Sequence, residues 1–369
     1  LPECSNILYA GLYWFGRANV GPDDNADGDN NPNTFSITKG SVTKDFDKTK
    51  VLLNGPGANG YEEIQANVVN GNDEIYFPSG VDQNIYTAYA DITTYVNDTN
   101  KGGIGEYFVA DMALSEGSSD QNGLSGGRGM VIVYENSKMN WRDITVFDGH
   151  AFVGGNGPAE TFSFDVDGFN AALGGQVNIK LGVMASEGER NFTSDYLEIE
   201  VLNTGTYQRL SADGTGNSST NFFTSSILTH SLPNMRTPDL FNNTGVDILM
   251  FDIPNTGNTI IANGQNATSF RYGSSSDGYA IFNLTFAVVA YVPEPVGVLT
   301  NTEINGVPNP PNSTLDPGES AGFNIQLTNR GTEAITNTVL TIPIPTSVDA
   351  SSLTFNENIN FIPTAGYSA

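Results

Sequence analysis

Residues 23–31, DDNADGDNN, place oxygen-bearing side chains at alternate positions around one glycine. Counted from the first residue, positions 1, 3, 5, 7 and 9 are Asp23, Asn25, Asp27, Asp29 and Asn31, and position 6 is a glycine. In calcium-binding loops, alternate side chains point inward and a glycine at position 6 permits the sharp turn. The spacing therefore predicts a calcium site formed by these five residues.

This loop departs from the EF-hand pattern at position 12, where that motif has a bidentate glutamate and this chain has Thr34. No helical pattern flanks the loop, so backbone oxygens or a distant carboxylate would complete the coordination. The alternative interpretation is a solvated Asp/Asn turn that joins two strands and binds no ion.

A second acidic segment, SEGERNFTSD, places Glu187, Glu189 and Asp195 directly after an apolar run. Carboxylate oxygens are ligands that calcium prefers, so these three residues predict a second, weaker cation site. The alternative is an acidic hairpin in which Glu189 pairs with Arg190 or with another basic residue.

Residues that could form a catalytic site are few. His150 and His230 are the only histidines, and they lack the spacing of a zinc site. Glu135 and Asp143 resemble a glycosidase carboxylate pair, but such pairs are common by chance in an acidic chain. Ser225 lacks the flanking glycines of a hydrolase nucleophile. We therefore expect a protein that is not an enzyme.

The charge of the chain limits its partners. Fifteen Lys and Arg face 41 Asp and Glu among 369 residues, a formal net charge of −26. Such a field repels nucleic acid and anionic membranes and favours divalent cations. Much of the other polar content is Asn, Ser, Thr and Gly, which is typical of exported β-proteins. No apolar run reaches the roughly 20 residues of a membrane helix, so we expect no membrane insertion and an extracellular, cell-surface location.

Cys4 is the single cysteine, which excludes a disulfide within these residues. The first residues have no initiator methionine and no signal-peptide pattern. We therefore expect a segment of a larger exported precursor, in which Cys4 is free or pairs with a cysteine elsewhere.

Short β-branched and aromatic runs, separated by Gly, Asn, Asp and Pro, recur along the chain, and helical periodicity is almost absent. Twenty-one Phe and 15 Tyr supply side chains that fill β-sheet cores. This pattern predicts an all-β protein, with a large jelly-roll-like β-sandwich over residues 1–292. Trp14, within the apolar run LYWF, is expected in its core.

The segment YVPEPVGVLT interrupts this pattern, and its two prolines cannot donate hydrogen bonds to a β-ladder. We place a domain boundary here. The following residues combine a turn, LDPGES, with an alternating strand, AGFNIQLTNRG, as at the start of an immunoglobulin-like β-sandwich. Residues 293–369 are therefore expected to hold such a domain, incomplete within this chain.

Several stretches in order along residues 5–292 resemble a module near the front of giant bacterial cell-surface adhesins, including gliding-motility adhesins exported by type IX secretion. The stretches are AGLYWFG, KVLLNGPG, YTAYADITTYV, GEYFVADM, GGRGMVIVYENSKMNWRDITVFDGH, VMASEGERNFTSDYLEIE, NFFTSSI and TGVDILMFDIP. The segment from LDPGES onward looks like the immunoglobulin-like stalk repeat of such proteins. The resemblance implies a surface filament protein and no catalytic residues.

The sequence is compatible with three functions. The first is a non-enzymatic, calcium-braced adhesin segment that binds polysaccharide, cells or substratum, as in gliding motility. The second is a structural cap or assembly module of a surface filament, with filament or secretion-system proteins as partners. The third is an extracellular carbohydrate-active enzyme that uses a carboxylate pair. We favour the first.

Overall fold

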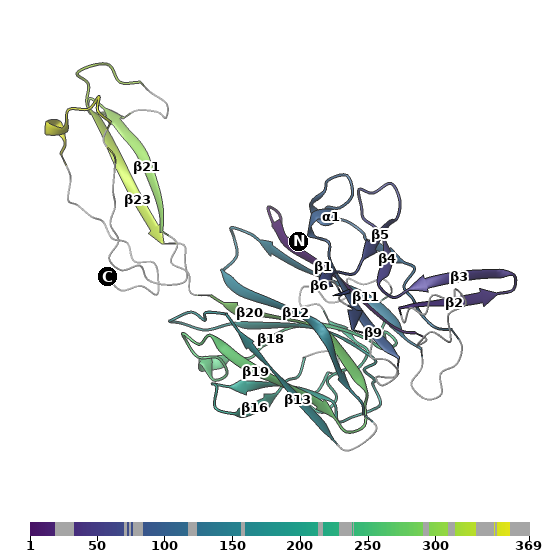
Figure 1. The fold of residues 1–369 in the computed structure, drawn as a ribbon. Coiled ribbons are helices and arrows are strands. Elements are labelled where there is room, and N and C mark those ends of the chain that lie inside the picture. Colours follow the sequence, from purple (N-terminus) through teal and green to yellow (C-terminus); the bar gives the residue numbers. More distant parts are fainter. Residues whose placement is uncertain are drawn as a thin grey trace. The chain divides into compact units, whose positions relative to one another are not determined.

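The computed structural model describes residues 1–18, 33–69, 72–73, 75–76, 84–116, 124–155, 159–212, 217–228, 238, 240–290, 295–308, 314–329, 343 and 345–354. The chain divides into two compact units, Leu1–Ala290 and Tyr291–Ala369 (Figure 1). Within the described residues, the helical elements are one α-helix and two short 3₁₀ turns: α1 (Thr93–Asn97), η2 (Thr256–Asn258) and η3 (Ala350–Ser352). Strands account for the other elements, which confirms the all-β prediction.

The first half of unit 1 is a β-sandwich. One of its sheets has the order β11 (Gly126–Glu135), β1 (Asn6–Arg17), β9 (Ile85–Asp91) and β8 (Ile75–Tyr76). The facing sheet has the order β10 (Phe108–Ala110), β4 (Lys50–Asn54) and β5 (Glu62–Gln65). Two hairpins accompany them, β2 (Thr34–Lys39) with β3 (Val42–Asp47) and β6 (Val68–Val69) with β7 (Asn72–Asp73).

The core of this first sandwich lies between β1 and β9 on one side and β4 on the other. Leu12 and Trp14 of β1 are completely buried there and share one apolar cluster with Leu53 and Tyr86. The indole Nε1 of Trp14 donates a hydrogen bond of 3.1 Å to the carbonyl oxygen of Lys48. The prediction that Trp14 is a core residue is therefore confirmed.

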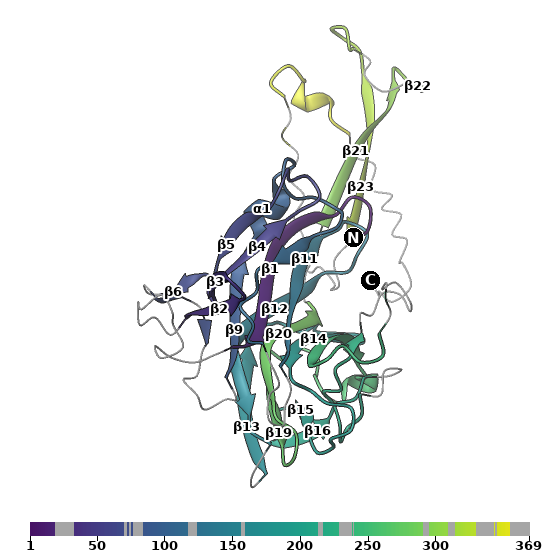
Figure 2. The same ribbon diagram turned by 90° about the vertical axis from the view of Figure 1, so that its right-hand side faces the viewer.

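The second half of unit 1 is another β-sandwich. Its larger sheet has the order β12 (Arg142–Val153), β20 (Tyr279–Val289), β14 (Ile179–Ser186), β18 (Val246–Ile253) and β17 (Ile227–Leu228). Its smaller sheet has the order β13 (Glu160–Asp167), β19 (Ala267–Ser274), β15 (Tyr196–Val201) and β16 (Thr206–Arg209). Figure 2 shows both sheets from the side, with β13, β15, β16 and β19 below β12, β14 and β20.

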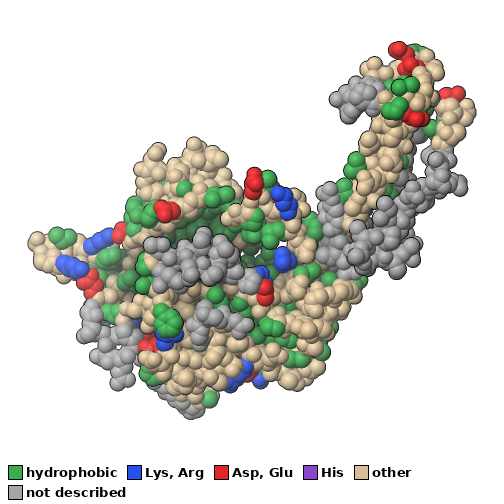
Figure 3. Space-filling view, turned by 180° about the vertical axis from the view of Figure 1, so that it is seen from behind, with side chains coloured by type: hydrophobic (Ala, Val, Ile, Leu, Met, Phe, Trp, Pro, Cys, Tyr) green, Lys and Arg blue, Asp and Glu red, His purple; other side chains and the backbone are tan. Residues whose placement is uncertain are grey.

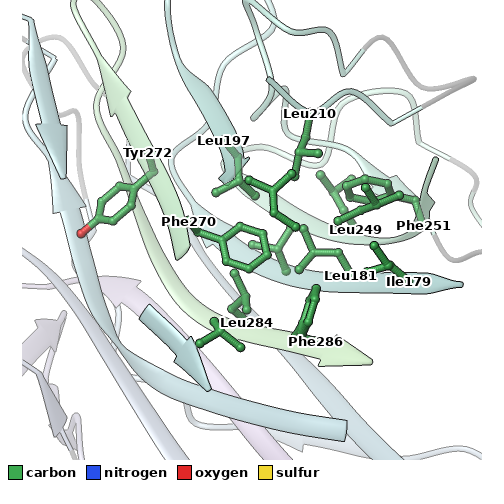
Figure 4. Packing of buried hydrophobic residues seen from close by; sticks show 14 of the residues in the cluster. Ile179, Leu181, Leu197, Leu210, Leu249, Phe251, Phe270, Tyr272, Leu284 and Phe286 are labelled. Carbon is green, nitrogen blue, oxygen red and sulfur yellow. The ribbon is translucent and has the colours of Figure 1, made fainter. Parts of the chain in front are cut away.

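Side chains from both sheets of the second sandwich fill the space between them (Figure 4). Leu181, Leu249 and Phe286 come from the larger sheet, and Leu197 and Phe270 come from the smaller one. All five are nearly or completely buried. Complete burial of each such side chain contributes about 1.5–3 kcal/mol to folding, so this core dominates the stability of the sandwich.

A third apolar layer joins the two sandwiches back to back. Because successive side chains of a strand point to opposite faces, Tyr13 and Phe15 of β1 face away from the first core. They pack with Met184 of β14 and Phe282 of β20, and the rings of Phe15 and Phe282 lie 5.3 Å apart. β1 is therefore buried on both faces, which explains the unbroken apolar run AGLYWFG. The β-sandwich prediction is confirmed, and its sheets stack as two joined sandwiches.

Unit 2 contains one described sheet with the strand order β22 (Val307–Pro308), β21 (Pro295–Ile304) and β23 (Ala321–Asn329). β21 and β23 pair antiparallel along most of their length, from Pro295 opposite Asn329 to Ile304 opposite Ala321. Pro295 is thus the first residue of a strand, a position where its missing N–H is tolerated. The immunoglobulin-like assignment of this unit stays a prediction.

Charged side chains are sparse on one face of unit 1. On the face shown in Figure 3, Asp, Glu, Lys and Arg are scattered among larger areas of uncharged side chains, as the composition predicts. Within the described part of the chain, no helix has the length and hydropathy needed to cross a membrane.

We predict that residues 1–290 expressed alone fold and unfold as one cooperative unit, because three connected apolar layers lie entirely within them. Thermal unfolding followed by circular dichroism and by tyrosine fluorescence tests this expectation. Coincident transitions would support it, and two separated transitions would show that the sandwiches unfold independently.

Candidate functional site: a buried carboxylate cluster

The predicted calcium loop Asp23–Asn31 lies outside the described residues, so its ligands stay a prediction. The second predicted site is described: Glu187, Glu189 and Asp195 lie in the loop between β14 and β15. Two further carboxylates join them, Asp247 of β18 and Asp277 of the turn between β19 and β20. We call these five residues the carboxylate cluster.

Strand pairing brings these distant residues together. The end of β14 pairs with two strands, so Ser186 lies opposite Val246 of β18 and Ala280 of β20. The start of β15 pairs with the end of β19, so Tyr196 lies opposite Gly273. The loop between β14 and β15 therefore ends up beside the start of β18 and the turn between β19 and β20.

Asp247 is completely buried and is held by three backbone N–H groups. Thr224 and Ser226 donate to its Oδ1 at 3.0 and 2.8 Å, and Ser225 donates to its Oδ2 at 3.0 Å. Burial and, to a smaller extent, the charge of Asp195 raise the pKa of Asp247 to about 7, although these three bonds lower it. This carboxyl therefore shapes the segment 224–226.

Asp195 is completely buried, but only one of its two carboxylate oxygens has hydrogen-bond partners. Its Oδ1 accepts hydrogen bonds from the N–H groups of Phe222 and Phe223. Its Oδ2 is buried without a hydrogen-bond partner. Burial raises the pKa of Asp195 to about 6, although the two N–H bonds act in the opposite direction. A buried carboxylate oxygen without a partner is costly, so this atom needs a proton or a ligand.

Glu187 connects the two sandwiches. Its Oε1 lies 3.6 Å from Nη1 of Arg17, at the end of β1, and its Oε2 accepts a 3.0 Å hydrogen bond from the hydroxyl of Ser125. Arg17 and Glu187 are both nearly buried, and burial raises the pKa of Glu187 to about 7, while the charge of Arg17 lowers it. The structure therefore places this predicted cation ligand in a buried ion pair.

Asp277 is buried at the turn between β19 and β20, where its Oδ2 accepts a 3.2 Å hydrogen bond from the N–H of Glu189. Burial, together with the charges of Asp195, Glu189 and Glu187, raises its pKa to about 8, although the bond from the N–H of Glu189 lowers it. Burial also raises the pKa of Glu189. Asp277 is therefore the most crowded carboxyl of the cluster.

Ser225 ties the surrounding loops together. Its backbone has a left-handed φ of 54°, and its hydroxyl donates to the carbonyl of Gly188 and accepts a 2.8 Å bond from the N–H of Gly245. Its own carbonyl accepts a 2.8 Å bond from the N–H of Asn243. Three loops therefore meet here, residues 187–195, 217–226 and 240–245, which together we call the loop end.

Two phenylalanine side chains of the loop end are exposed. Phe241 is 74% exposed and Phe192 is 48% exposed. The guanidinium carbon of Arg190 lies 3.3 Å from the centre of the Phe241 ring, and Nη1 donates a 2.8 Å hydrogen bond to the carbonyl of Phe241. Arg190 thus pairs with an aromatic ring, and the structure does not show the ion pair with Glu189 that the hairpin alternative proposed.

The cluster offers carboxylate chemistry, either proton uptake or cation binding. Within the described residues, Asp, Glu, His and Cys side chains form no ready-made group of three for a metal ion. Of the catalytic candidates, Glu135 accepts a hydrogen bond from Asn6 and Asp143 accepts one from the N–H of Asn170. The hydroxyl of Ser225 is committed to Gly188.

Sequence reasoning missed Asp247 and Asp277. Asp247 stands in the strand-like run GVDILMFD and Asp277 in a serine-rich turn, SSSDGY, so neither belongs to a local ligand motif. One signal was present: an aspartate within an otherwise apolar strand start is rarely buried unless it is paired.

No protein-family model matches the chain, and no curated protein matches it. Among solved structures, dimeric latent PorU from Porphyromonas gingivalis is similar at 9% identity and a TM-score of 0.22, over 78% of this chain and 22% of that one. A chain in the structure of the infectious bursal disease virus Gt strain is similar at 9% identity and a TM-score of 0.24, over 77% of this chain and 56% of that one. The chain thus spans only part of each, and at these TM-scores neither likeness bears on function.

We predict that Gly188→Ala destabilises unit 1 by about 1–3 kcal/mol, because the added Cβ would overlap Oδ2 of Asp247 and lie 2.6 Å from Cβ of Phe223. Denaturant unfolding measures the change. Gly60→Ala is the matched control, since a Cβ there meets no atom within 4 Å. Equal stability of the two variants would contradict the packing described around Asp247.

Proposed function

We propose that this chain is a non-enzymatic segment of an extracellular cell-surface adhesin, and that the loop end carries its binding surface. Its ligand would be a polysaccharide, another cell or a substratum. The observation that carries the proposal is the pair of exposed aromatic residues, Phe192 and Phe241, on loops anchored to the buried carboxylate cluster.

Exposed aromatic rings on fixed loops suit recognition of another molecule. A large apolar side chain in water gains free energy when a partner covers it, and rings such as those of Phe192 and Phe241 also stack on flat partners. The Arg190 guanidinium, stacked on Phe241, adds a positive group to a strongly acidic protein. This combination supports binding to a sugar-rich or weakly anionic surface.

The loop end also has the rigidity that binding requires. Asp195 fixes the N–H groups of Phe222 and Phe223, and Asp247 fixes those of Thr224, Ser225 and Ser226. Since ordering a loop at the moment of binding costs free energy, loops that are already fixed bind more tightly. Calcium binding by the loop Asp23–Asn31, which lies outside the described residues, stays part of this proposal.

We predict that Phe192→Ala and Phe241→Ala each weaken binding to immobilised cell-surface polysaccharide about tenfold, which corresponds to about 1.4 kcal/mol. Surface plasmon resonance measures the affinity. Phe108→Ala is the matched control, because Phe108 is 51% exposed in the first sandwich and should not affect binding.

Retention of full affinity by both loop-end variants would place the binding surface elsewhere. If the wild-type protein binds no polysaccharide, cell or substratum, the function as a structural cap of a filament replaces this proposal. Release of sugar fragments from the polysaccharide during the experiment would instead identify an enzyme.

A further inference from the structure

We propose that the carboxylate cluster is a calcium site in which Asp195, Asp277 and Glu189 ligate the ion, while Glu187 and Asp247 hold the surrounding structure. This inference goes beyond the proposed function and does not depend on which molecule the loop end binds. It also changes the ligand set expected from the sequence, because Asp277 takes the place of Glu187.

One carboxylate oxygen of Asp195 has no hydrogen-bond partner. Its side chain is completely buried, and its Oδ1 is used by two N–H groups, which leaves Oδ2 without a hydrogen-bond partner. The charge of Asp195 acts on both Asp277 and Asp247, so its carboxylate lies among the acidic groups of the cluster. A cation beside Oδ2 would supply the missing interaction.

Some carboxylates of the cluster have both oxygens bonded to protein groups, and others have an oxygen that is available to an ion. Both oxygens of Asp247 are used by backbone N–H groups, and both oxygens of Glu187 have partners in Arg17 and Ser125. Asp277 uses Oδ2 to accept from the N–H of Glu189. Its other oxygen, the carboxylate of Glu189 and Oδ2 of Asp195 are the groups available for an ion.

Electrostatic repulsion also favours a cation here, because the charges of Asp195, Glu189 and Glu187 all act unfavourably on Asp277. Three like charges near one buried carboxyl repel one another strongly where water is excluded. A divalent cation converts this repulsion into attraction, and calcium prefers oxygen ligands with flexible geometry.

The turn between β19 and β20 is fixed to the loop that carries Asp195, which favours a shared site. The hydroxyl of Ser194 lies 3.2 Å from that of Ser274 and 2.9 Å from that of Ser276, and it accepts a 3.0 Å bond from the N–H of Ser275. The carboxylates are not yet gathered around one point. We therefore expect calcium to draw the side chains of Glu189 and Asp277 toward Asp195.

The test is thermal unfolding of the full chain at pH 7.5, in millimolar calcium and in excess chelator. For the wild type we expect calcium to raise the unfolding midpoint by about 3 °C or more, because the ion binds the folded state. With Asp27→Asn also present, so that the loop Asp23–Asn31 contributes nothing, the response should be lost in Asp277→Asn and in Glu189→Gln, two isosteric changes. It should persist in Asp165→Asn, an exposed control on β13, and in Asp27→Asn if the loop Asp23–Asn31 is a separate site.

A second readout separates a ligand from a merely structural residue. In chelator, Asp277→Asn should unfold at the same temperature as the wild type or higher, because the isosteric amide is uncharged and keeps an oxygen that accepts from the N–H of Glu189. Lower stability in chelator would assign Asp277 a structural role alone.

The proposal is overturned if calcium does not raise the unfolding midpoint of the wild type, or if Asp277→Asn and Glu189→Gln respond to calcium like the wild type. These outcomes leave the polysaccharide-binding experiment with the Phe192 and Phe241 variants unaffected.

Discussion

Burial of carboxyl groups at the loop end is the constraint on which the rest of this site depends. A carboxylate removed from water is unstable unless hydrogen bonds, an opposite charge, a proton or a metal ion compensate it. The cluster uses several of these solutions side by side. Asp247 has three N–H donors, Glu187 has Arg17 and Ser125, and Asp195 has two N–H donors for one of its oxygens.

The layered fold explains why these groups gather at one end. The sheets that contain β1, β14 and β20 have apolar layers on both faces, and the buried charged residues Arg17, Glu187 and Asp247 lie at or next to the ends of their strands. Beside the end of β14 and the starts of β15 and β18, the backbone N–H groups of residues 222–226, which precede β17, donate to Asp195 and Asp247. Carboxylates at these points order loops that would otherwise have unsatisfied backbone groups. Rigid loops, in turn, are suited to present Phe192 and Phe241 to a partner.

The sequence predicted the all-β class because its strands are short, aromatic and separated by turn residues. The run AGLYWFG also contained a clue to the layering, since both odd and even positions are apolar, as in a strand buried on two faces. The packing of β1 side chains against Met184 and Phe282 depends on contacts between distant segments, which no local pattern encodes.

The acidic loop was visible in the sequence because Glu187, Glu189 and Asp195 are close along the chain. The sequence did not indicate that Asp247 and Asp277 belong to the same cluster, because only the strand register places them beside that loop. The partner of Glu187 was equally hidden, because Arg17 lies in the other sandwich. Carboxylates are therefore recognisable from sequence, whereas their roles depend on which distant N–H or cation reaches them.

The stability of unit 1 as a function of pH, measured by denaturant unfolding in chelator, tests the central role of these carboxyls most directly. Burial raises the pKa values of Glu187 and Asp247 to about 7 and that of Asp277 to about 8, so the folded state holds these protons more tightly than the unfolded chain. The stability that depends on them is complete below about pH 4 and is lost as the pH rises toward 8. We predict that the free energy of unfolding falls steadily between pH 5 and pH 8, and less steeply in Asp277→Asn. A free energy that is constant or that rises over this range would contradict the burial of these carboxyl groups.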